Sequence, residues 1–253
     1  MMIKRLDELR AGFENAEVIY RRENRIVIRS RQAAFGQSLI IKMWSRPDLK
    51  GKLRRLLHIS SCDHEWRTLV RLSQVSMAVP YPLGLCRLTP DIAGYTEALF
   101  TEDLGECASA TNYLKQLIQS GQEQQVLRFE NVMIEMTEQI LAARMIDVDH
   151  GLVNIVVQSS GRPVRLDFEL ARLVIWPRLF PTPYGHMLGQ LILLHAFAVQ
   201  PDTDRTTQFA ARLRERLRPP RRALARAAIY IRKYIKVQLD NTGIDTRLTL
   251  PWD

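Results

Sequence analysis

The chain has 253 residues, of which 46% are hydrophobic, and a formal net charge of +9. This length allows one large lobe or two small ones, each with a real core. The three cysteines are odd in number and lack metal-ligand spacing, so the sequence predicts neither a disulfide framework nor a zinc site and favours a reducing, cytoplasmic setting. No secretory signal is apparent, and the longest apolar run, near Leu188 to Val199, is interrupted and too short to span a bilayer. We therefore expect a soluble or peripheral protein.

The positive charge is concentrated toward the C-terminus, because eleven Lys or Arg residues stand against two acidic residues between Arg205 and Asp240. Such a segment predicts contact with phosphates of a nucleic acid, an anionic lipid or a phosphorylated glycan, although a solvated helix face is an equally good explanation. Nucleic acid is disfavoured because the segment has no aromatic stacking platform and no recognised motif.

The first part of the chain has the pattern of a three-stranded antiparallel meander, with strands expected at Ala16 to Tyr20, Arg25 to Arg29 and Ser38 to Trp44. Turns are expected at Arg21 to Asn24 and at Gln32 to Gln37. In the third strand one lysine, Lys42, interrupts an apolar run. A buried lysine should face a carboxylate or a phosphate, whereas the alternative is a lysine at an edge strand that reaches solvent.

A basic segment, Lys50 to Arg55, precedes a helix expected from Cys62 to Gln74, and Glu65 lies beside the apolar face of that helix. Taken alone, Glu65 is better explained as an exposed helix residue, and only its spacing from Lys42 favours an ion pair. Two more strands, Leu83 to Leu88 and Glu97 to Thr101, around a turn at Thr89 to Gly94, would complete a five-stranded sheet. A turn-rich connector, Glu102 to Glu106, follows the last strand.

Two helices expected at Ser109 to Ser120 and Glu123 to Arg144 lead to a polar hairpin. Its strands are Ile155 to Val157 and Val164 to Leu166, with Asp149 and Asn154 before the first and Asp167 after the second. Carboxylate and amide oxygens at one end of a hairpin are typical of a magnesium site, while a surface hairpin with polar turn residues is the alternative. The spacing is that of the phosphoryl-transfer template, in which a base Asp precedes a metal-binding Asn by five positions.

The remaining chain is predicted to be helical after an irregular loop marked by Pro177, Pro181 and Pro183. The three helices are expected at Gly185 to Val199, Thr206 to Leu217 and Arg221 to Leu239. The last helix is amphipathic and basic, so it could lie on an anionic membrane or simply pack on the other helices.

Taken in order, these residues resemble a protein-kinase-like phosphotransferase over about residues 16 to 200. Within that superfamily the resemblance is closest to the bacterial lipopolysaccharide core sugar kinases, the Kdo/heptose kinase or WaaP-like family. The motifs that carry it are Glu65-Trp-Arg-Thr-Leu, Val79-Pro-Tyr-Pro-Leu, Leu99-Phe-Thr-Glu-Asp-Leu and Asp167-Phe-Glu-Leu-Ala-Arg172.

The resemblance implies an α+β, two-lobed protein-kinase-like fold, with a five-stranded antiparallel N-lobe over residues 1–102 and a mainly helical C-lobe over residues 103–253. It implies ATP and Mg²⁺ as cofactors, a lipopolysaccharide core glycolipid or another sugar as acceptor, and a cytoplasmic location, peripheral on the inner membrane, with Arg205 to Lys236 in contact with anionic lipid. The implied roles are base for Asp149, metal ligands for Asn154 and Asp167, phosphate contact for Lys42, an anchor of that lysine for Glu65, and adenine binding for the connector with Glu102 and Leu104.

Several departures keep an alternative open. No glycine stands between Arg21 and Arg25 to cover ATP phosphates, and Asp147, Gly151 and Glu169 replace the His, Lys and Gly of protein kinases. These changes argue against a regulated protein kinase. They leave as alternatives a non-catalytic, pseudokinase-like binding protein or a kinase for another small molecule.

Overall fold

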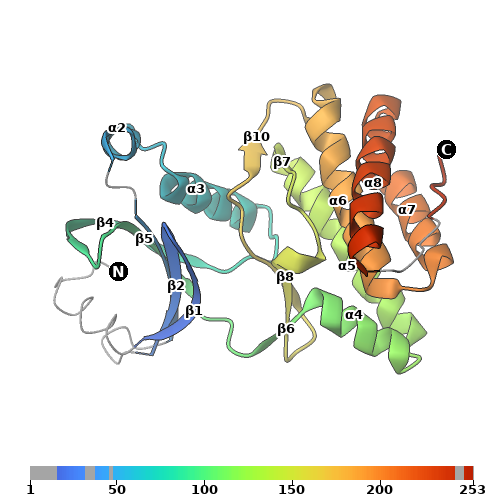
Figure 1. The fold of residues 1–253 in the computed structure, drawn as a ribbon, viewed down its shortest axis with the longest axis horizontal. Helices are drawn as coiled ribbons and strands as arrows, with labels where there is room; N and C mark the ends of the chain where they lie inside the picture. Colours follow the sequence, from blue (N-terminus) through green and yellow to red (C-terminus); the bar gives the residue numbers. More distant parts are fainter. Residues whose placement is uncertain (1–15, 32–37, 46–47, 243–247, 253) are drawn as a thin grey trace. The chain divides into compact units, whose positions relative to one another are not determined.

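The computed structural model describes residues 16–31, 38–45, 48–242 and 248–252 of the chain. Two compact units are formed (Figure 1). Unit 1 contains the described residues of Met1–Ser73 and Val79–Gly105, and unit 2 contains those of Gln74–Ala78 and Glu106–Asp253. The architecture is mixed α+β, with an antiparallel sheet in unit 1 and most of the helices in unit 2.

Unit 1 is built on a five-stranded sheet in which every neighbouring pair of strands is antiparallel. The strand order is β1-β2-β3-β5-β4. In β2 the buried residues alternate with partly exposed ones, as expected for a strand with one face on a core. The strands are β1 (Glu17–Arg22), β2 (Arg25–Ser30), β3 (Leu39–Trp44), β4 (Pro82–Ile92) and β5 (Tyr95–Glu102).

Two turns of this sheet contain fewer residues than the sequence predicts. Arg22 pairs with Arg25, so the first turn is only Glu23 and Asn24 rather than Arg21 to Asn24. β4 continues to Ile92, which leaves two residues for the turn expected at Thr89 to Gly94. Strand pairing therefore extends through residues that look like loop residues when the sequence is considered locally.

Two helices complete unit 1. The expected helix is α3 (Ser61–Gln74), which begins with reciprocal hydrogen bonds: Asp63 N donates to Ser60 Oγ, and Ser60 N donates to an Asp63 carboxylate oxygen. The basic segment before it, for which we predicted no structure, forms α2 (Leu49–Leu56). The Asp48 carboxylate accepts a hydrogen bond from Gly51 N, 3.1 Å away, and so caps that helix.

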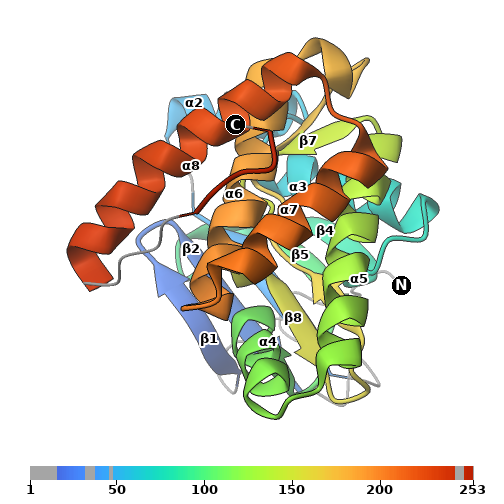
Figure 2. The ribbon, with the colours of Figure 1, turned by 90° about the vertical axis from the view of Figure 1, so that its right-hand side faces the viewer.

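Unit 2 has a helical core, visible in Figure 2, around the strongly apolar α6 (Pro181–Val199). The other helices are α4 (Ala110–Gln119), α5 (Glu123–Ala142), α7 (Thr203–Leu217) and α8 (Arg221–Thr242). α8 lies directly on α6: a Cβ at Gly185 would be 2.5 Å from Ala223 O, so only glycine fits there. Leu224, Ala228 and Ile231 of α8 are buried, so packing uses the apolar side of the basic tail. No described helix is long and apolar enough to cross a membrane.

The predicted start of α6 at Gly185 is wrong, since the helix begins four residues earlier at Pro181. Pro181 and Pro183 belong to its first turn, where a proline does not remove an intrahelical hydrogen bond. α7 also begins earlier than expected, at Thr203, because the Asp202 carboxylate accepts a hydrogen bond from Arg205 N. The 3₁₀ turn η3 (Pro177–Leu179) precedes α6.

Short strands of unit 2 hold the polar hairpin in place. The expected hairpin is confirmed as β8 (Ile155–Gln158) and β9 (Pro163–Arg165), with Ile155 opposite Arg165. Its flanking strands were not predicted: β6 (Cys107–Ser109) pairs with β8, and β7 (Met145–Asp147) pairs with β10 (Ala171–Leu173). The 3₁₀ turn η2 (Leu152–Asn154) leads directly into β8.

Candidate functional site

Lys42 and Glu65 form a buried ion pair in unit 1. Lys42 Nζ, from β3, lies 2.7 Å from Glu65 Oε2, from α3. The residues are 9% and 5% exposed, respectively. Lys42 is therefore not an edge-strand lysine that reaches solvent, and Glu65 is not an exposed helix residue. The ammonium also lies 5.2 Å from the centre of the Trp44 ring. A cation held in this way has a fixed position from which it can bind an anion.

The connector after β5 contains Glu102 and Leu104, the residues assigned to nucleotide binding. Glu102 is tied to Tyr81 twice: Tyr81 N donates to the Glu102 carboxylate at 2.9 Å, and Glu102 N donates to Tyr81 O at 3.0 Å. Leu104 is half-buried. Between them, the Asp103 carboxylate accepts hydrogen bonds from Ser38 Oγ and Gly105 N and pairs with Arg29. The connector backbone is therefore well fixed within unit 1.

Asp149 and Asn154 meet at the start of the hairpin in unit 2. Asn154 Nδ2 donates to an Asp149 carboxylate oxygen at 2.8 Å and to the Asp149 backbone carbonyl at 3.0 Å. The 3₁₀ turn η2 makes this approach possible, since it folds the five-residue separation into one compact loop. The amide nitrogen of Asn154 thus orients the carboxylate, while its amide oxygen is a ligand of the kind that Mg²⁺ prefers.

Arg165 organises this loop, although the sequence did not identify it as a functional residue. Its guanidinium lies 2.6 Å from the Asp147 carboxylate and donates to the backbone carbonyls of Asp149 and Asn154 at 3.1 Å each. It also lies 5.0 Å from the centre of the Phe168 ring. Burial raises the pKa of Asp147 and the Arg165 cation opposes that shift. The sequence signal for Arg165 was its position between two apolar residues, Val164 and Leu166. The same pattern equally fits an arginine that faces solvent.

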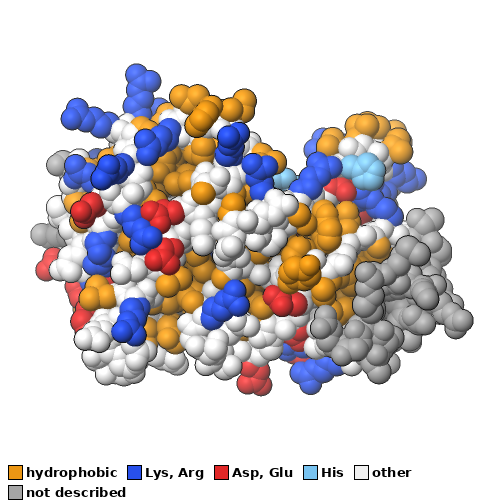
Figure 3. All heavy atoms as spheres, turned by 180° about the vertical axis from the view of Figure 1, so that it is seen from behind, with side chains coloured by type: hydrophobic (Ala, Val, Ile, Leu, Met, Phe, Trp, Pro, Cys, Tyr) orange, Lys and Arg blue, Asp and Glu red, His pale blue; other side chains and the backbone are white. Residues whose placement is uncertain are grey.

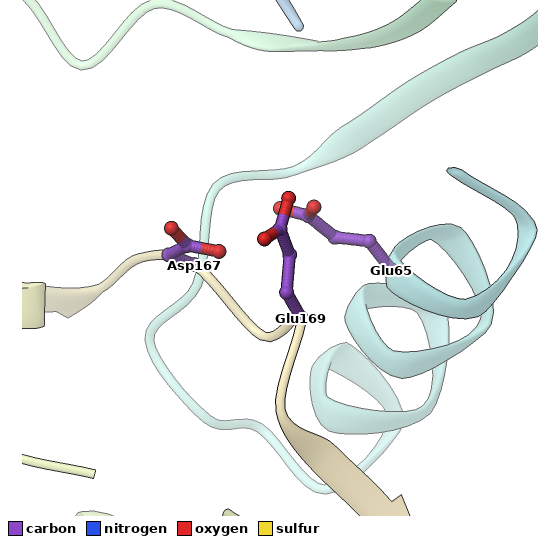
Figure 4. A group of neighbouring side chains, drawn as sticks. All are labelled: Glu65, Asp167 and Glu169. Carbon is purple, nitrogen blue, oxygen red and sulfur yellow. The ribbon is translucent and has the colours of Figure 1, made fainter. Parts of the chain in front are cut away.

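Asp167 and Glu169 lie on the stretch that connects β9 to β10 (Figure 4). A carboxylate oxygen from each comes within 4.8 Å of the other, which is close enough for both to bind one cation. Asp167 has a φ of +53°, a left-handed conformation that Asp and Asn tolerate better than most residues. Figure 4 also shows Glu65, the partner of Lys42, on α3. In the sequence Glu169 is apparent only as a departure from the kinase pattern, so its place beside Asp167 was not predicted.

The two residues after Asp149 lie against helices of unit 2. His150 is completely buried, with Nε2 3.0 Å from Thr137 Oγ1, and burial lowers its pKa to about 3. At Gly151 a Cβ would lie 2.3 Å from a methyl carbon of Leu194 on α6, so a larger side chain would require that leucine side chain to move.

The charge of Asp149 reaches Tyr230 of α8, a residue that the sequence did not indicate for the site. Its hydroxyl donates to Gln190 Oε1 at 2.5 Å, and its ring packs against His186 and Tyr234, with centroids 5.2 and 4.5 Å away. Burial raises the pKa of Tyr230, and the charges of Tyr234 and Asp149 add to the shift. A neutral phenol that the Asp149 charge reaches therefore lies in an aromatic cluster with His186 of α6 and Tyr234 of α8.

Comparison of the sequence with models of known protein families and with curated proteins gives no match. A solved structure described as WaaP in complex with acyl carrier protein does match, with a TM-score of 0.59 and 16% sequence identity. The match covers 95% of this chain and 98% of that chain. The fold is similar to that of WaaP. The sequence motifs resemble the WaaP-like family, to which this name points. At 16% identity the likeness to WaaP concerns the fold alone.

Proposed function

We propose that the chain is an ATP-dependent kinase that phosphorylates a sugar hydroxyl, with a lipopolysaccharide core glycolipid as the acceptor. The observation that carries the proposal is the Asn154–Asp149 hydrogen bond of 2.8 Å, next to the acidic stretch that contains Asp167. An oriented carboxylate beside oxygen ligands is the arrangement that phosphoryl transfer to an alcohol requires. The likeness in fold to WaaP supports the same reaction class.

The residues fit Mg²⁺ and ATP. Asn154, Asp167 and Glu169 offer an amide oxygen and two carboxylates, and two of these groups lie within 4.8 Å of each other. When bound, Mg²⁺ would neutralise charge on the ATP phosphates. Lys42 would bind the α- and β-phosphates, with Glu65 fixing the lysine, and the connector with Glu102 and Leu104 would hold the adenine. In this proposal residues 1–102 form the N-lobe and residues 103–253 the C-lobe.

Asp149 would act on the acceptor. Its carboxylate would orient the sugar hydroxyl and accept its proton, because a base must be within hydrogen-bond reach of the proton that it removes. The hydrogen bonds from Asn154 hold the carboxylate in one orientation, which reduces the reorganisation needed during the reaction.

The positively charged helices α7 and α8 would contribute to acceptor binding. The basic segment Arg205 to Lys236, which covers most of α7 and α8, would contact the anionic groups of a core glycolipid or of the membrane that holds it. The protein would then work at the cytoplasmic face of the inner membrane as a peripheral enzyme. Another sugar remains the alternative acceptor.

The test is transfer of labelled phosphate from ATP to purified core glycolipid, with free sugars and protein as competing acceptors. We expect Asp149→Asn to reduce transfer by at least about 1000-fold, because Asn keeps the size of the side chain but cannot accept the proton. Nucleotide binding should persist in this variant. Turnover by Asp149→Asn at the wild-type rate would reject the assignment.

A second candidate is a non-catalytic binding protein with the same fold. The first hairpin favours it, because its turn is only Glu23 and Asn24 and no glycine lies between Arg21 and Arg25 to approach a phosphate. Stabilisation of the wild type by Mg²⁺-ATP in thermal unfolding, lost in Lys42→Ala, supports the kinase. Absence of any nucleotide-dependent shift in the wild type supports the binding protein.

A further inference from the structure

The stretch Leu170 to Phe180 of unit 2 exposes an unusual amount of apolar surface. Six large hydrophobic side chains among its eleven residues are between 43% and 71% exposed. They are Leu170, Leu173, Ile175, Trp176, Leu179 and Phe180. Exposed hydrophobic residues are ordinary when scattered, but several on one short stretch mark an interaction surface.

The backbone of this stretch is held by the rest of unit 2. β10 pairs with β7, with Arg172 opposite Ile146, and Val174 N donates to Arg144 O at 2.9 Å. Ala171 is buried, and the following 3₁₀ turn leads into α6. A fixed backbone therefore presents these side chains to solvent, so the exposure is a property of the fold.

The charge of the stretch is entirely positive. It contains Arg172 and Arg178, both exposed, and no acidic residue. The guanidinium of Arg144, also exposed, lies 5.6 Å from the centre of the Trp176 ring. Tryptophan with arginine beside it is typical of side chains at the boundary between acyl chains and headgroups. The complementary partner is apolar and negatively charged.

We propose that Leu170 to Phe180 docks on an anionic lipid bilayer, with its apolar side chains in the headgroup–acyl boundary and its arginines on lipid phosphates. A bilayer accommodates protruding apolar residues without a shaped groove and supplies phosphates at the same depth as the arginines. Because Asp167 and Glu169 directly precede the stretch, docking would place the candidate metal ligands close to the membrane surface. Vesicle binding needs no nucleotide, so this surface can exist whether or not the proposed kinase activity does.

A separate observation in unit 1 points to the same partner. α2 carries Leu49, Leu53 and Leu56 at helical spacing, and these side chains are 54% to 83% exposed instead of packed. The helix contains Lys50, Lys52 and two arginines but no acidic residue. A helix with an open apolar face and basic flanks is characteristic of a membrane-surface helix. Figure 3 shows hydrophobic side chains at the surface with Lys and Arg beside them, at the upper edge of the view.

The experiment is sedimentation of the full chain with vesicles of phosphatidylcholine alone or mixed with phosphatidylglycerol. We expect binding only to the mixed vesicles, and about 100-fold weaker binding for the triple variant Ile175→Ser, Trp176→Ser, Leu179→Ser, since each side chain contributes about fivefold. A second triple variant, Leu49→Ser, Leu53→Ser, Leu56→Ser, tests α2 in the same way. All six residues are exposed, so the fold should not depend on them.

The matched control is Leu127→Ser, an exposed leucine on α5, which should bind as the wild type does. Emission from Trp176 should shift to shorter wavelength on docking, a signal that Trp176→Phe removes. Loss of binding in Arg222→Gln, Arg226→Gln with full binding by both triple variants would overturn the proposal in favour of α8. Dimerisation of the wild type without vesicles, abolished in the Ile175 triple variant, would overturn it in favour of a second copy.

Discussion

The Arg165 guanidinium lies 2.6 Å from the Asp147 carboxylate, and both residues are completely buried. The same guanidinium reaches the backbone carbonyls of Asp149 and Asn154. One buried ion pair thus joins the end of β7, the Asp149 loop and β9. In the protein kinases that the motifs resemble, a histidine stands at the position of Asp147. The position of the candidate base therefore depends here on electrostatic pairing.

Arg165→Leu should lower the free energy of unfolding by about 3–5 kcal/mol, because it leaves the Asp147 carboxylate buried without its cation. The double variant Asp147→Leu, Arg165→Leu should recover a large part of this loss, since replacing both members of a buried pair costs less than breaking it. Urea unfolding of the three proteins measures both effects. Equal stability of Arg165→Leu and the wild type would contradict the role given to Arg165.

Two pairs of candidate site residues could be recognised from the sequence. Lys42 in an apolar strand needed a partner, and Glu65 on the next predicted helix supplies it. Asp149 and Asn154, which the sequence placed at one end of the hairpin, also form a hydrogen bond. The expectation for Lys42 succeeded because it rests on a local pattern together with the cost of burying an unpaired charge.

Features that depend on tertiary contacts could not be predicted. β7 and β10 have three residues each and exist because they pair with each other across the hairpin. α2 looks like a basic loop, and nothing in its own sequence reveals that its apolar side stays exposed. The role of Arg165 also depends on a tertiary contact, because the sequence of a strand does not show whether a single arginine faces solvent or a buried aspartate.

Glu169 should contribute to cation binding together with Asp167, because their carboxylate oxygens lie within 4.8 Å of each other. Under the proposed kinase activity, we expect Glu169→Gln to raise the Mg²⁺ concentration for half-maximal transfer by about 10-fold, and Asp167→Asn to abolish transfer. Asn tolerates the positive φ of residue 167, so Asp167→Asn changes the charge without adding backbone strain. A magnesium titration of activity checks both variants, and an unchanged midpoint for Glu169→Gln would remove this residue from the site.

His150 should make the protein less stable as the pH falls. Burial lowers its folded pKa to about 3, whereas the unfolded value is about 6.5. Between these values the unfolded state binds a proton that the folded state does not, so stability declines by up to about 1.4 kcal/mol per pH unit. Urea unfolding from pH 7 to pH 4 should give a shallower dependence for His150→Leu.

The control for this pH dependence is Leu127→Ser, because it changes an exposed residue of α5 and removes no titratable group. The free energy of unfolding of this variant should change with pH as that of the wild type does. His195, also buried with a lowered pKa, remains in all three proteins and contributes the same background. Identical slopes for His150→Leu and the wild type would mean that His150 does titrate in the folded state.

Tyr230 should influence acceptor binding more than nucleotide binding, because its hydroxyl donates to Gln190 and the charge of Asp149, the proposed base, reaches it and raises its pKa. For the proposed kinase, we expect Tyr230→Phe to raise the acceptor KM by about 10-fold, while kcat and the KM for ATP stay within about twofold, since loss of a binding contact alone leaves the chemical step intact. Tyr234→Phe, which removes a more exposed hydroxyl from the same helix, is the matched control and should change none of the three constants. A fall in kcat with an unchanged acceptor KM would instead place Tyr230 among the groups that position Asp149 for proton transfer.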